Sequence, residues 1–419
     1  MNNTEHKSQV RHKCVLVIID GLGDVPIHAL NDKTPLEAAD TPVMDRLAAA
    51  GSIGLVDPIR PGTIPGTHSG TGLLMGLLPT QVDLLSRGPV EAAGLGRVLE
   101  PGEVALRANF ATLERHSSGY HIRDRRAGRI TQGADELAAL LKNVDLGDGV
   151  QANLLSTDQH RAALILSGPG LDARISDTDP KDRGMPSDVI LCRHTEQAAE
   201  LTSSKINLFM EQAYQRLVDH PVNIERIRRG AMPANGVLTR SAGSQYKLDN
   251  ILQKRAVSTA LVSGCNTVRG LGRIFGFNVI SDPRFTAGVN TDLVAKVSAA
   301  ESLLDEHDLV FIHIKGTDIC SHDRQPLRKR DLLQRLDQAI EPLLDAGVVI
   351  AVGADHTTDS VSGSHTADPV PALIASPGSN LYKSRVKFGE SHCRKGKLGG
   401  LSNSGFLSRV LNELGISVP

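Results

Sequence analysis

Aspartate and histidine side chains recur in this sequence directly after short apolar runs, at CVLVII, LVFIHI and GVVIAV. One pair among them, Asp318 and His322, is spaced i to i+4, which places both side chains on one face of a helical turn, as two ligands of one ion require. Carboxylate and imidazole together suit Mn²⁺, Zn²⁺, Co²⁺ or Mg²⁺. The candidate ligands are Asp20, Asp318, His322, Asp355, His356 and His365.

Each candidate ligand also has a purely structural explanation. A lone aspartate after a strand usually caps a helix or forms a turn, Asp-x-x-x-His pairs are common, and a single loop histidine is usually a surface residue. The coincidence favours a metal site, because all the apolar runs that precede these residues read as strands whose carboxyl ends meet at one sheet edge. We therefore expect two ions roughly 3.5–4 Å apart, which can clamp the attacking and leaving oxygens of a phosphoryl transfer.

The loop PGTIPGTHSGTGLLMG supplies hydroxyl groups that could act as a nucleophile. Thr67, Ser69 and Thr71 are flanked by glycines and stand just before an apolar helix, whose N-terminal N–H groups could cradle a phosphate. The structural alternative is a turn with an N-cap hydroxyl. A serine-hydrolase role for Ser69 is disfavoured, because the G-x-S-x-G elbow is absent and the Asp/His groups would stay unexplained.

The elements that position these residues read as an α/β sheet. Short, continuously apolar runs predict buried parallel strands. Thr41 as N-cap, Pro42 at the first helical position and Gly51 at the end predict one helix, and a helical period predicts another over 328–340. Alternating strands and helices predict a doubly wound sheet. The predicted strands are 14–19, 309–314, 347–352 and 372–375.

The middle of the chain has a different pattern. From about 107 to 235, polar and apolar residues alternate between Gly and Pro turns, and a long helical stretch is expected from about 188 to 217. We therefore expect a discontinuous metal-binding core over 1–105 and 236–419. Residues 106–235 are expected to form an inserted α+β substrate-binding cap over its active edge.

Composition limits the partners. The 419 residues carry 46 Lys plus Arg against 47 Asp plus Glu, so the chain shows no electrostatic footprint for nucleic acid or an anionic membrane, and an anionic ligand must be small. Five distant cysteines without a C-x-x-C pair predict neither a disulfide framework nor a zinc knuckle. No apolar run approaches a membrane span. We expect a soluble cytoplasmic protein, with a homo-oligomer left open.

The ordered motifs resemble the archaeal-type, cofactor-independent phosphoglycerate mutases of the alkaline phosphatase superfamily. The resemblance spans nearly the whole chain, through segments that include VLVIIDGLGD, KTPLEAADTPVMDRLAAAG, RGPVEAAG, DRRAGRI, GTDICSHD, GADHTTD and HTADPVPALI. It implies an alkaline-phosphatase-like doubly wound α/β core with an inserted cap. It also implies two divalent metal ions, no 2,3-bisphosphoglycerate, and a glycolytic role.

The resemblance also implies a role for each candidate ligand. Asp20, Asp355 and His356 are similar to the ligands of one ion, which the nucleophile oxygen of Thr67 completes. The ligands of the other ion correspond to Asp318, His322 and His365.

Other charged residues acquire roles in the same way. Lys315 is placed to neutralise the transferring phosphoryl group. Five residues of the cap motifs are expected to bind the carboxylate and hydroxyls of a small phospho-acid, for which guanidinium forks are suited; surface salt bridges are their structural alternative. They are Arg107, Asp124, Arg126, Arg129 and Arg161. Asp177 and Asp179 read as turn formers.

The nucleophile loop departs from the family pattern. The family's serine is followed by Asp-Thr-Ala-His, whereas Thr67 is followed by His68-Ser69-Gly70-Thr71, and the tyrosine-rich stretch before Arg87 is replaced by LLPTQVDLLS. The leading prediction is conversion of 3-phosphoglycerate to 2-phosphoglycerate through a phosphothreonine.

Three alternatives stay open besides the serine hydrolase. The first is a divergent mutase or hydrolase that acts on a phosphonate or another phosphate ester in a specialised biosynthetic pathway. The second is a metal-stabilised binding protein without activity. The third, nucleotide binding through GLGRIFG, is the weakest, because its glycine spacing is wrong for the dinucleotide fingerprint.

Overall fold

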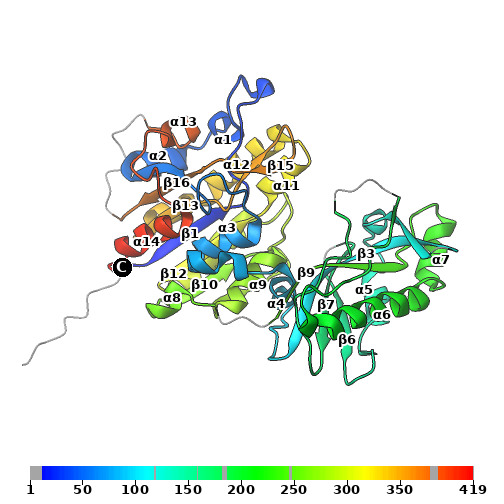
Figure 1. The fold of residues 1–419 in the computed structure, drawn as a ribbon. Coiled ribbons are helices and arrows are strands. Elements are labelled where there is room, and N and C mark those ends of the chain that lie inside the picture. The colour runs from blue at the N-terminus through cyan, green and yellow to red at the C-terminus, as the bar shows by residue number, and fades with distance from the viewer. Residues whose placement is uncertain are drawn as a thin grey trace, which may run out of the picture. The chain divides into compact units, whose positions relative to one another are not determined.

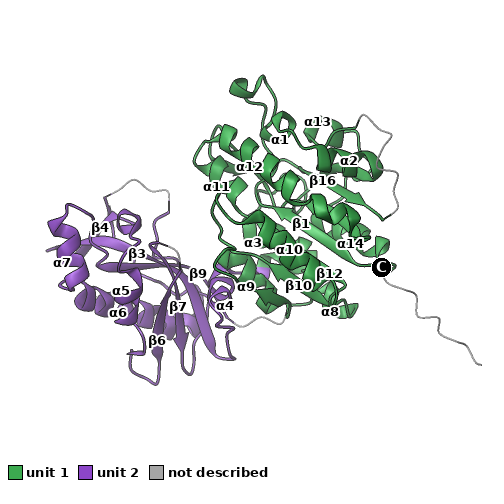
Figure 2. Cartoon of the chain, turned by 180° about the vertical axis from the view of Figure 1, so that it is seen from behind, with its two compact units in different colours: residues 1–83, 248–419 green, residues 84–247 purple. Residues whose placement is uncertain are grey.

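The chain consists of two compact units (Figure 2). The computed structural model describes residues 12–117, 119–157, 159–181, 186–244, 248–377 and 386–418. Unit 1 comprises Met1–Asp83 and Leu248–Pro419, and unit 2 comprises Leu84–Lys247. One unit is therefore assembled from both ends of the chain, and the other is inserted into it.

Unit 1 contains a seven-stranded sheet in the order β11-β10-β12-β1-β13-β16-β2 (Figure 1). The first five strands are parallel, and β16 and β2 are antiparallel to their neighbours. The fold is thus the predicted α/β class, with the strand expected at 372–375 running against the parallel set. In sheet order the strands are Asn278–Ile280, Thr259–Val262, Leu309–Ile314, Cys14–Ile19, Val349–Gly353, Val370–Ala375 and Ser52–Val56.

The register of the central strands brings their carboxyl ends to one edge. Ile19 of β1 pairs with Ile314 of β12, and Ile18 pairs with Gly353 of β13. Every residue of these three strands is buried, as expected for parallel strands covered on both faces. The polar residues that follow the three strands therefore start from neighbouring points of the same edge.

Helices cover both faces of this sheet. On one face, apolar residues of α2 (Pro42–Ala50), α10 (Leu293–Leu303) and α12 (Pro326–Ala339) share a core with Val15, Val17 and Val352. On the other face, Phe406 of α14 (Asn403–Glu413) and Leu74 of α3 (Thr67–Leu74) approach Gly353. The helix α9 (Asn266–Ile274) lies on that face as well, since its Gly272 approaches Leu261 of β10. The sheet is therefore doubly wound, as predicted.

Shorter elements complete unit 1. They lie near the ends of the longer ones or connect them: η1 (His28–Leu30), α1 (Pro35–Ala38), η2 (Pro79–Leu84), α8 (Ile251–Lys254), α11 (Gly316–His322), η5 (Glu341–Asp345), α13 (Glu390–Cys393) and the two-stranded sheet of β14 (Thr357–Asp359) and β15 (Ser364–Thr366).

Unit 2 contains an antiparallel sheet built around the long strand β3 (Glu103–His116). The order is β5-β6-β7-β3-β4-β8, and β9 also pairs with β3. One face, with Leu106, Ala108 and Phe110, packs against α6 (Glu200–Leu217). The other strands are β4 (Gly119–Asp124), β5 (Val144–Asp145), β6 (Gln151–Ser156), β7 (Arg161–Ser167), β8 (Ser187–Asp188) and β9 (Gly236–Ser244).

The helix α4 (Arg87–Gly94) covers the opposite face of this sheet. Its Ala92 packs with Ala105 and Ala163, and a Cβ added at Gly88 would lie 2.1 Å from the carbonyl oxygen of Ala105. Only glycine permits this approach of the helix to the strand. The remaining helices are η3 (Ala127–Arg129), α5 (Ala134–Ala139), η4 (Gln197–Ala199) and α7 (Pro221–Arg228).

Two sequence-based boundaries differ from the structure. The expected insert 106–235 begins inside β3 and stops before β9, whereas α4 and β9 both pack on β3 and extend the unit to 84–247. The helix expected from about 188 begins at Glu200, because residues 189–196 form non-helical connections before η4. Helical periodicity alone did not locate that start.

All five cysteines lie in the described ranges, are buried and form no disulfide, as their spacing predicts. Among the helices of the described residues, none has the length and apolar composition needed to cross a membrane.

The buried carboxylate of Asp337 yields a stability prediction. It lies on α12 and accepts hydrogen bonds from Val43 N (3.1 Å) and Met44 N (2.7 Å), so it caps α2, whose own N-cap Thr41 makes no side-chain capping bond. Burial raises the pKa of Asp337 from 3.8 to about 6, despite the two N–H donors.

Because the folded protein holds this proton more tightly than the unfolded chain, Asp337 costs stability as the pH rises from about 4 to about 6. Relative to wild type, Asp337→Asn should therefore gain on the order of 2–3 kcal/mol of unfolding free energy across this range. Urea unfolding at several pH values measures the difference between the two proteins. A difference that stays constant with pH contradicts the prediction.

Candidate functional site

The structure brings the six predicted ligands together in unit 1, in two groups of three. Within each group one ligand atom of every residue lies within 4.8 Å of the others. The parallel register accounts for this, because Asp20 follows β1, Asp318 lies on α11 after β12, and Asp355 follows β13. We call the groups cluster A, which is Asp20, Asp355 and His356, and cluster B, which is Asp318, His322 and His365.

The two histidines of cluster B turn the same nitrogen toward the cluster. His322 Nδ1 donates to Gly363 O (2.7 Å) and His365 Nδ1 donates to Pro65 O (2.9 Å). A carbonyl oxygen only accepts, so each Nδ1 carries a proton, and Nε2 is the nitrogen of each ring that is left to bind a cation. The two Nε2 atoms lie 3.2 Å apart, and they lie 3.3 and 3.5 Å from Asp318 Oδ1.

Cluster A is fully buried and its carboxylates are held by neighbouring groups. Asp20 Oδ2 accepts from His313 Nε2 (3.1 Å), and Asp355 Oδ1 accepts from Gly21 N (3.0 Å). His356 Nε2 lies 3.3 Å from Asp20 Oδ1 and 3.2 Å from Asp355 Oδ2. Burial lowers the pKa of His356, but the two carboxylates outweigh it and raise that pKa to about 10.

Thr67 and Lys315 lie beside both clusters. Thr67 is the first residue of α3, and its Oγ1 lies 3.3 Å from His356 Nε2 and accepts from Lys315 Nζ at 3.1 Å. Lys315 Nζ also lies 2.9 Å from Asp20 Oδ1 and 2.6 Å from Asp318 Oδ2. Burial opposes ionisation of Lys315, but these two carboxylates raise its pKa above the ordinary range. The ammonium group therefore stays charged next to the threonine hydroxyl.

The donor sets of both clusters fit divalent cations. In cluster B two imidazole lone pairs and a carboxylate oxygen converge, and in cluster A two buried carboxylates and an imidazole converge. Carboxylate oxygens and imidazole nitrogens packed this closely repel one another and require positive charge between them. In the described residues this charge comes from Lys315 and from imidazole protonation. Oxygen and imidazole nitrogen are the ligands that Mn²⁺, Zn²⁺, Co²⁺ and Mg²⁺ accept.

The other hydroxyl groups of the loop have structural partners. Ser69 Oγ accepts from Gly66 N (3.0 Å) and donates to Gly66 O (2.9 Å), so it caps the start of α3. Thr71 Oγ1 donates to Asp355 Oδ2 over 3.4 Å. Thr67 is thus the hydroxyl of this loop that lies between Lys315 and a cluster histidine. The structural alternative, a turn with a capping hydroxyl, describes Ser69 in the first turn of α3.

In unit 2 the structure gathers four of the five predicted binding residues. Burial, then the charges of Arg161, Arg126, Arg107 and Arg129, lower the pKa of His160 to about 3, so this histidine is neutral among four guanidinium groups.

Arg107 is the buried member of this group, at 8% exposure, and its Nε has no hydrogen-bond partner among the described residues. Burial, then Arg87 and Arg240, lowers its pKa to about 8. Arg240 pairs with Arg107 across the strands β9 and β3. Glu91 offsets these positive charges only in part, so a bound anion would stabilise this set of like charges.

Asp124 has a different position from the four arginines. Its carboxylate accepts from Arg126 N (2.9 Å) and Gly128 N (2.6 Å), so it shapes the loop that carries Arg126 and Arg129. Asp179 forms a bidentate pair with Arg125, with both distances 2.8 Å, and is not only a turn former. Asp177 accepts from Ser241 N and pairs with Lys181.

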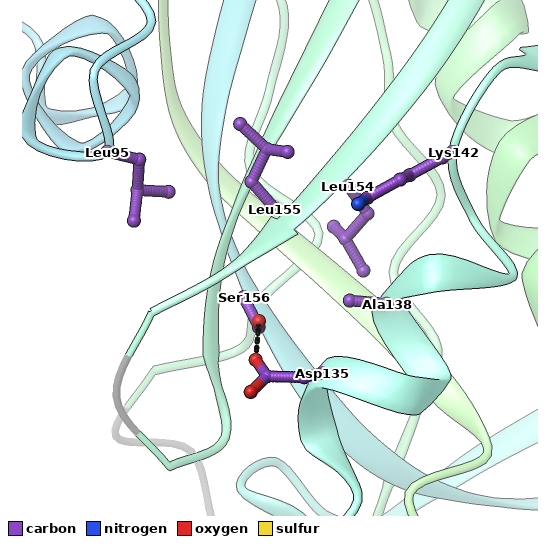
Figure 3. A pocket seen from close by; sticks show the side chains of 7 residues that line it. All are labelled: Leu95, Asp135, Ala138, Lys142, Leu154, Leu155 and Ser156. Atoms are coloured by element: carbon purple, nitrogen blue, oxygen red, sulfur yellow. Dashed lines mark hydrogen bonds between the residues drawn. The ribbon is translucent and has the colours of Figure 1, made fainter.

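A cavity of about 310 Å³ also lies in unit 2 (Figure 3). It contains none of the predicted site residues. Ser156 donates to Asp135 at its wall. It is lined by Leu95, Asp135, Ala138, Lys142, Leu154, Leu155 and Ser156.

Sequence reasoning missed several residues that hold the site. His313 lies inside the apolar run LVFIHI, where a buried histidine next to strand β1 was the available signal. Thr358 and Arg240 gave no signal, because hydroxyls after an Asp-His pair and arginines in a strand are common.

Comparisons with known proteins identify relatives of this chain. A family model described as 2,3-bisphosphoglycerate-independent phosphoglycerate mutase matches residues 48–223. Curated proteins of that name from Methanopyrus kandleri and Ignicoccus hospitalis are each 40% identical, over 87% and 92% of this chain and 88% and 94% of their own. A solved structure titled cofactor-independent phosphoglycerate mutase from Thermoplasma acidophilum is 32% identical, covers 96% of this chain and 100% of its own, and gives a TM-score of 0.69.

A solved protein from Pyrococcus horikoshii gives a TM-score of 0.82 at 30% identity, and covers 98% of this chain and 99% of its own. The fold and the two clusters define an α/β protein with an inserted α+β unit and a carboxylate–imidazole site beside a helix-terminal threonine. The chain belongs to the 2,3-bisphosphoglycerate-independent phosphoglycerate mutase family.

The position of Lys315 generates a prediction. Its ammonium group neutralises two buried carboxylates, so Lys315→Met should lower the unfolding free energy in the presence of EDTA by about 3–5 kcal/mol. Added Mn²⁺ should recover most of this loss, because a cation bound to the clusters supplies the missing charge.

Chemical denaturation with EDTA and with Mn²⁺ measures both effects. The control is Lys254→Met, which removes a half-exposed ion pair with Asp249 and should cost at most about 1 kcal/mol in either condition. An equal loss for Lys315→Met in both conditions would contradict the assignment.

Proposed function

We propose that this protein is a metal-dependent phosphoglycerate mutase that interconverts 3-phosphoglycerate and 2-phosphoglycerate through a phosphothreonine at Thr67. The observation that carries the proposal is the position of Thr67 Oγ1, 3.1 Å from Lys315 Nζ and 3.3 Å from His356 Nε2. Family membership supports the same reaction, since the relatives carry this name over nearly their whole length.

In the proposed first step, Thr67 Oγ1 forms a bond to phosphorus and the bond from phosphorus to the substrate's ester oxygen breaks. Thr67 loses one proton in this step and the leaving oxygen of the substrate gains one, so the step is balanced. Lys315 donates to Thr67 Oγ1 and keeps positive charge next to the transferring group. In the second step the phosphoryl group returns to the other hydroxyl of glycerate, which gives the isomer.

Two divalent ions, Mn, Zn, Co or Mg, are proposed at clusters A and B, with Thr67 as a further ligand at cluster A. Ions at these positions supply positive charge to the attacking, transferring and leaving oxygens. Asp20, Asp355 and His356 would hold one ion, and the other three ligands would hold the second. The arrangement needs no 2,3-bisphosphoglycerate, because the enzyme's own threonine carries the phosphoryl group.

The arginine cluster of unit 2 is proposed to bind the anionic groups of the phospho-acid. Arg107 and Arg161 lie on neighbouring strands and repel one another, so an anion would relieve the repulsion and supply a partner for Nε of Arg107. Arg126 and Arg129 lie on the loop that Asp124 shapes. With such a substrate, the proposed role is glycolytic and the proposed location cytoplasmic.

Variants of Thr67 test the nucleophile. Thr67→Val keeps the shape of the side chain without its oxygen and should lower kcat by roughly 10³-fold or more. Thr67→Ser keeps a hydroxyl and should stay active, with a phosphoenzyme that is more labile to alkali, because phosphoserine eliminates phosphate more readily than phosphothreonine.

Phosphorus NMR of 3-phosphoglycerate with Mn²⁺ separates isomerisation from phosphate release, and mass spectrometry maps the phosphorylated residue. The proposal expects 2-phosphoglycerate as the product and a phosphoryl group on residue 67. A phosphoryl group on Ser69, or release of inorganic phosphate without isomerisation, would contradict the proposal.

Arg107 should show opposite effects on activity and stability. Arg107→Met removes a buried charge whose Nε lacks a hydrogen-bond partner and whose burial and positive neighbours outweigh Glu91, so the unfolding free energy should rise by about 1–3 kcal/mol. The same change removes a donor for the substrate anion and should lower kcat/KM by about 10²-fold.

Steady-state kinetics and urea unfolding of the same preparation measure both quantities. The matched control is Arg123→Met, whose guanidinium is exposed and pairs with Glu114, and which should change neither quantity appreciably. Loss of both stability and activity in Arg107→Met would assign Arg107 a structural role instead.

A further inference from the structure

Thr358 connects the two clusters through a single hydroxyl group. It lies on β14, is fully buried, and its Oγ1 lies 2.7 Å from Asp318 Oδ1 and 3.0 Å from His356 Nδ1. Asp318 belongs to cluster B and His356 to cluster A. One side chain outside the six ligands therefore contacts a ligand of each proposed ion.

The chemistry of the three groups fixes the direction of both hydrogen bonds. An ionised carboxylate only accepts, so the one proton of the hydroxyl is donated to Asp318 Oδ1. The oxygen of Thr358 then accepts, and His356 Nδ1–H is the donor. With its proton on Nδ1, a neutral His356 has its lone pair on Nε2, the atom that faces Thr67, Asp20 and Asp355.

The surrounding backbone keeps this hydroxyl in place. Gly21, in the turn after β1, has φ +63°, and a Cβ there would lie 2.6 Å from Thr358 Oγ1 and 3.0 Å from Asp318 Cβ. On the other side, Lys329 Nζ donates to Thr358 O (3.4 Å) and to Gly23 O (3.2 Å). A close backbone approach and a buried lysine thus fix the strand on which Thr358 lies.

We propose that Thr358 is a positioning residue that sets the proton-bearing nitrogen of His356 and the orientation of Asp318, and so couples the two metal sites. The inference rests on the proposed function only in taking the clusters as metal sites. Groups that hydrogen-bond to metal ligands typically change metal affinity by 10–100-fold when removed. Because Thr358 contacts both clusters, its loss weakens the binding of both ions, and not of one alone.

The test compares three variants of the full chain. Thr358→Val has nearly the same shape and no hydroxyl, and Thr358→Ser retains the hydroxyl. Thr357→Val is the matched control, because Thr357 is the adjacent buried threonine and its Oγ1 donates to the backbone carbonyl of Asp368 (3.2 Å). Unfolding in EDTA establishes that each variant is folded before metal is added.

Calorimetric titration of the metal-free proteins with Mn²⁺ measures the affinity at both sites. Thr358→Val should bind both ions about 10–100-fold more weakly than wild type. Thr358→Ser and Thr357→Val should stay within about threefold of wild type. The visible spectrum of the Co²⁺-loaded protein should change for Thr358→Val and not for Thr357→Val, since it reports the geometry of the ligands.

The outcomes separate this inference from the proposed function. Wild-type affinity in Thr358→Val, weak binding in both valine variants, or failure of Thr358→Ser to restore binding overturns the role of Thr358 while the metal sites stand. Binding that weakens at one site alone overturns the coupling. A wild-type protein that binds no Mn²⁺ overturns the metal sites and the inference together.

Discussion

The site of unit 1 depends on the Nδ1 hydrogen bonds of three imidazoles. Carbonyl oxygens of Gly363 and Pro65 and the hydroxyl of Thr358 each accept from one ring, so His322, His365 and His356 all turn Nε2 toward the clusters. Buried carboxylates packed this closely repel one another unless positive charge lies between them, and in cluster A a proton on His356 supplies part of it. Part of that charge is supplied by Lys315, whose ammonium group also reaches Thr67 Oγ1. The need for positive charge thus places the proposed nucleophile and a charged ammonium group side by side.

Unit 2 presents the opposite electrostatic problem. Its β3 and β9 bring Arg107 and Arg240 together as a cross-strand pair, and burial together with the neighbouring arginines lowers the pKa of His160 and keeps it neutral. A buried guanidinium without a hydrogen-bond partner at Nε costs stability, and such a cost is typical of a site that is completed by its ligand. Each unit therefore carries charge that the folded chain balances incompletely. In unit 1 the excess charge is negative and would be balanced by cations, and in unit 2 it is positive and would be balanced by anions.

The sequence was sufficient for the parts of this protein that depend on strand ends and local periodicity. Apolar runs located β1 and β12, and the register of parallel strands then made it predictable that Asp20, Asp318 and Asp355 meet. Contacts between side chains distant in sequence were not predictable in the same way. Thr358 and His313 act through hydrogen bonds to ligands, which no spacing reveals, and the start of unit 2 depends on Gly88 of α4 packing on β3. The antiparallel direction of β16 was equally hidden, because a short apolar run reads the same in both directions.

Anomalous X-ray diffraction from crystals of the Mn²⁺-loaded protein tests the central claim most directly. The account predicts two anomalous peaks, one bounded by Asp20, Asp355 and His356 and the other by Asp318, His322 and His365, with the histidines bound through Nε2. Peaks at other positions, coordination through Nδ1, or clusters that hold no ion at saturating Mn²⁺ would contradict it.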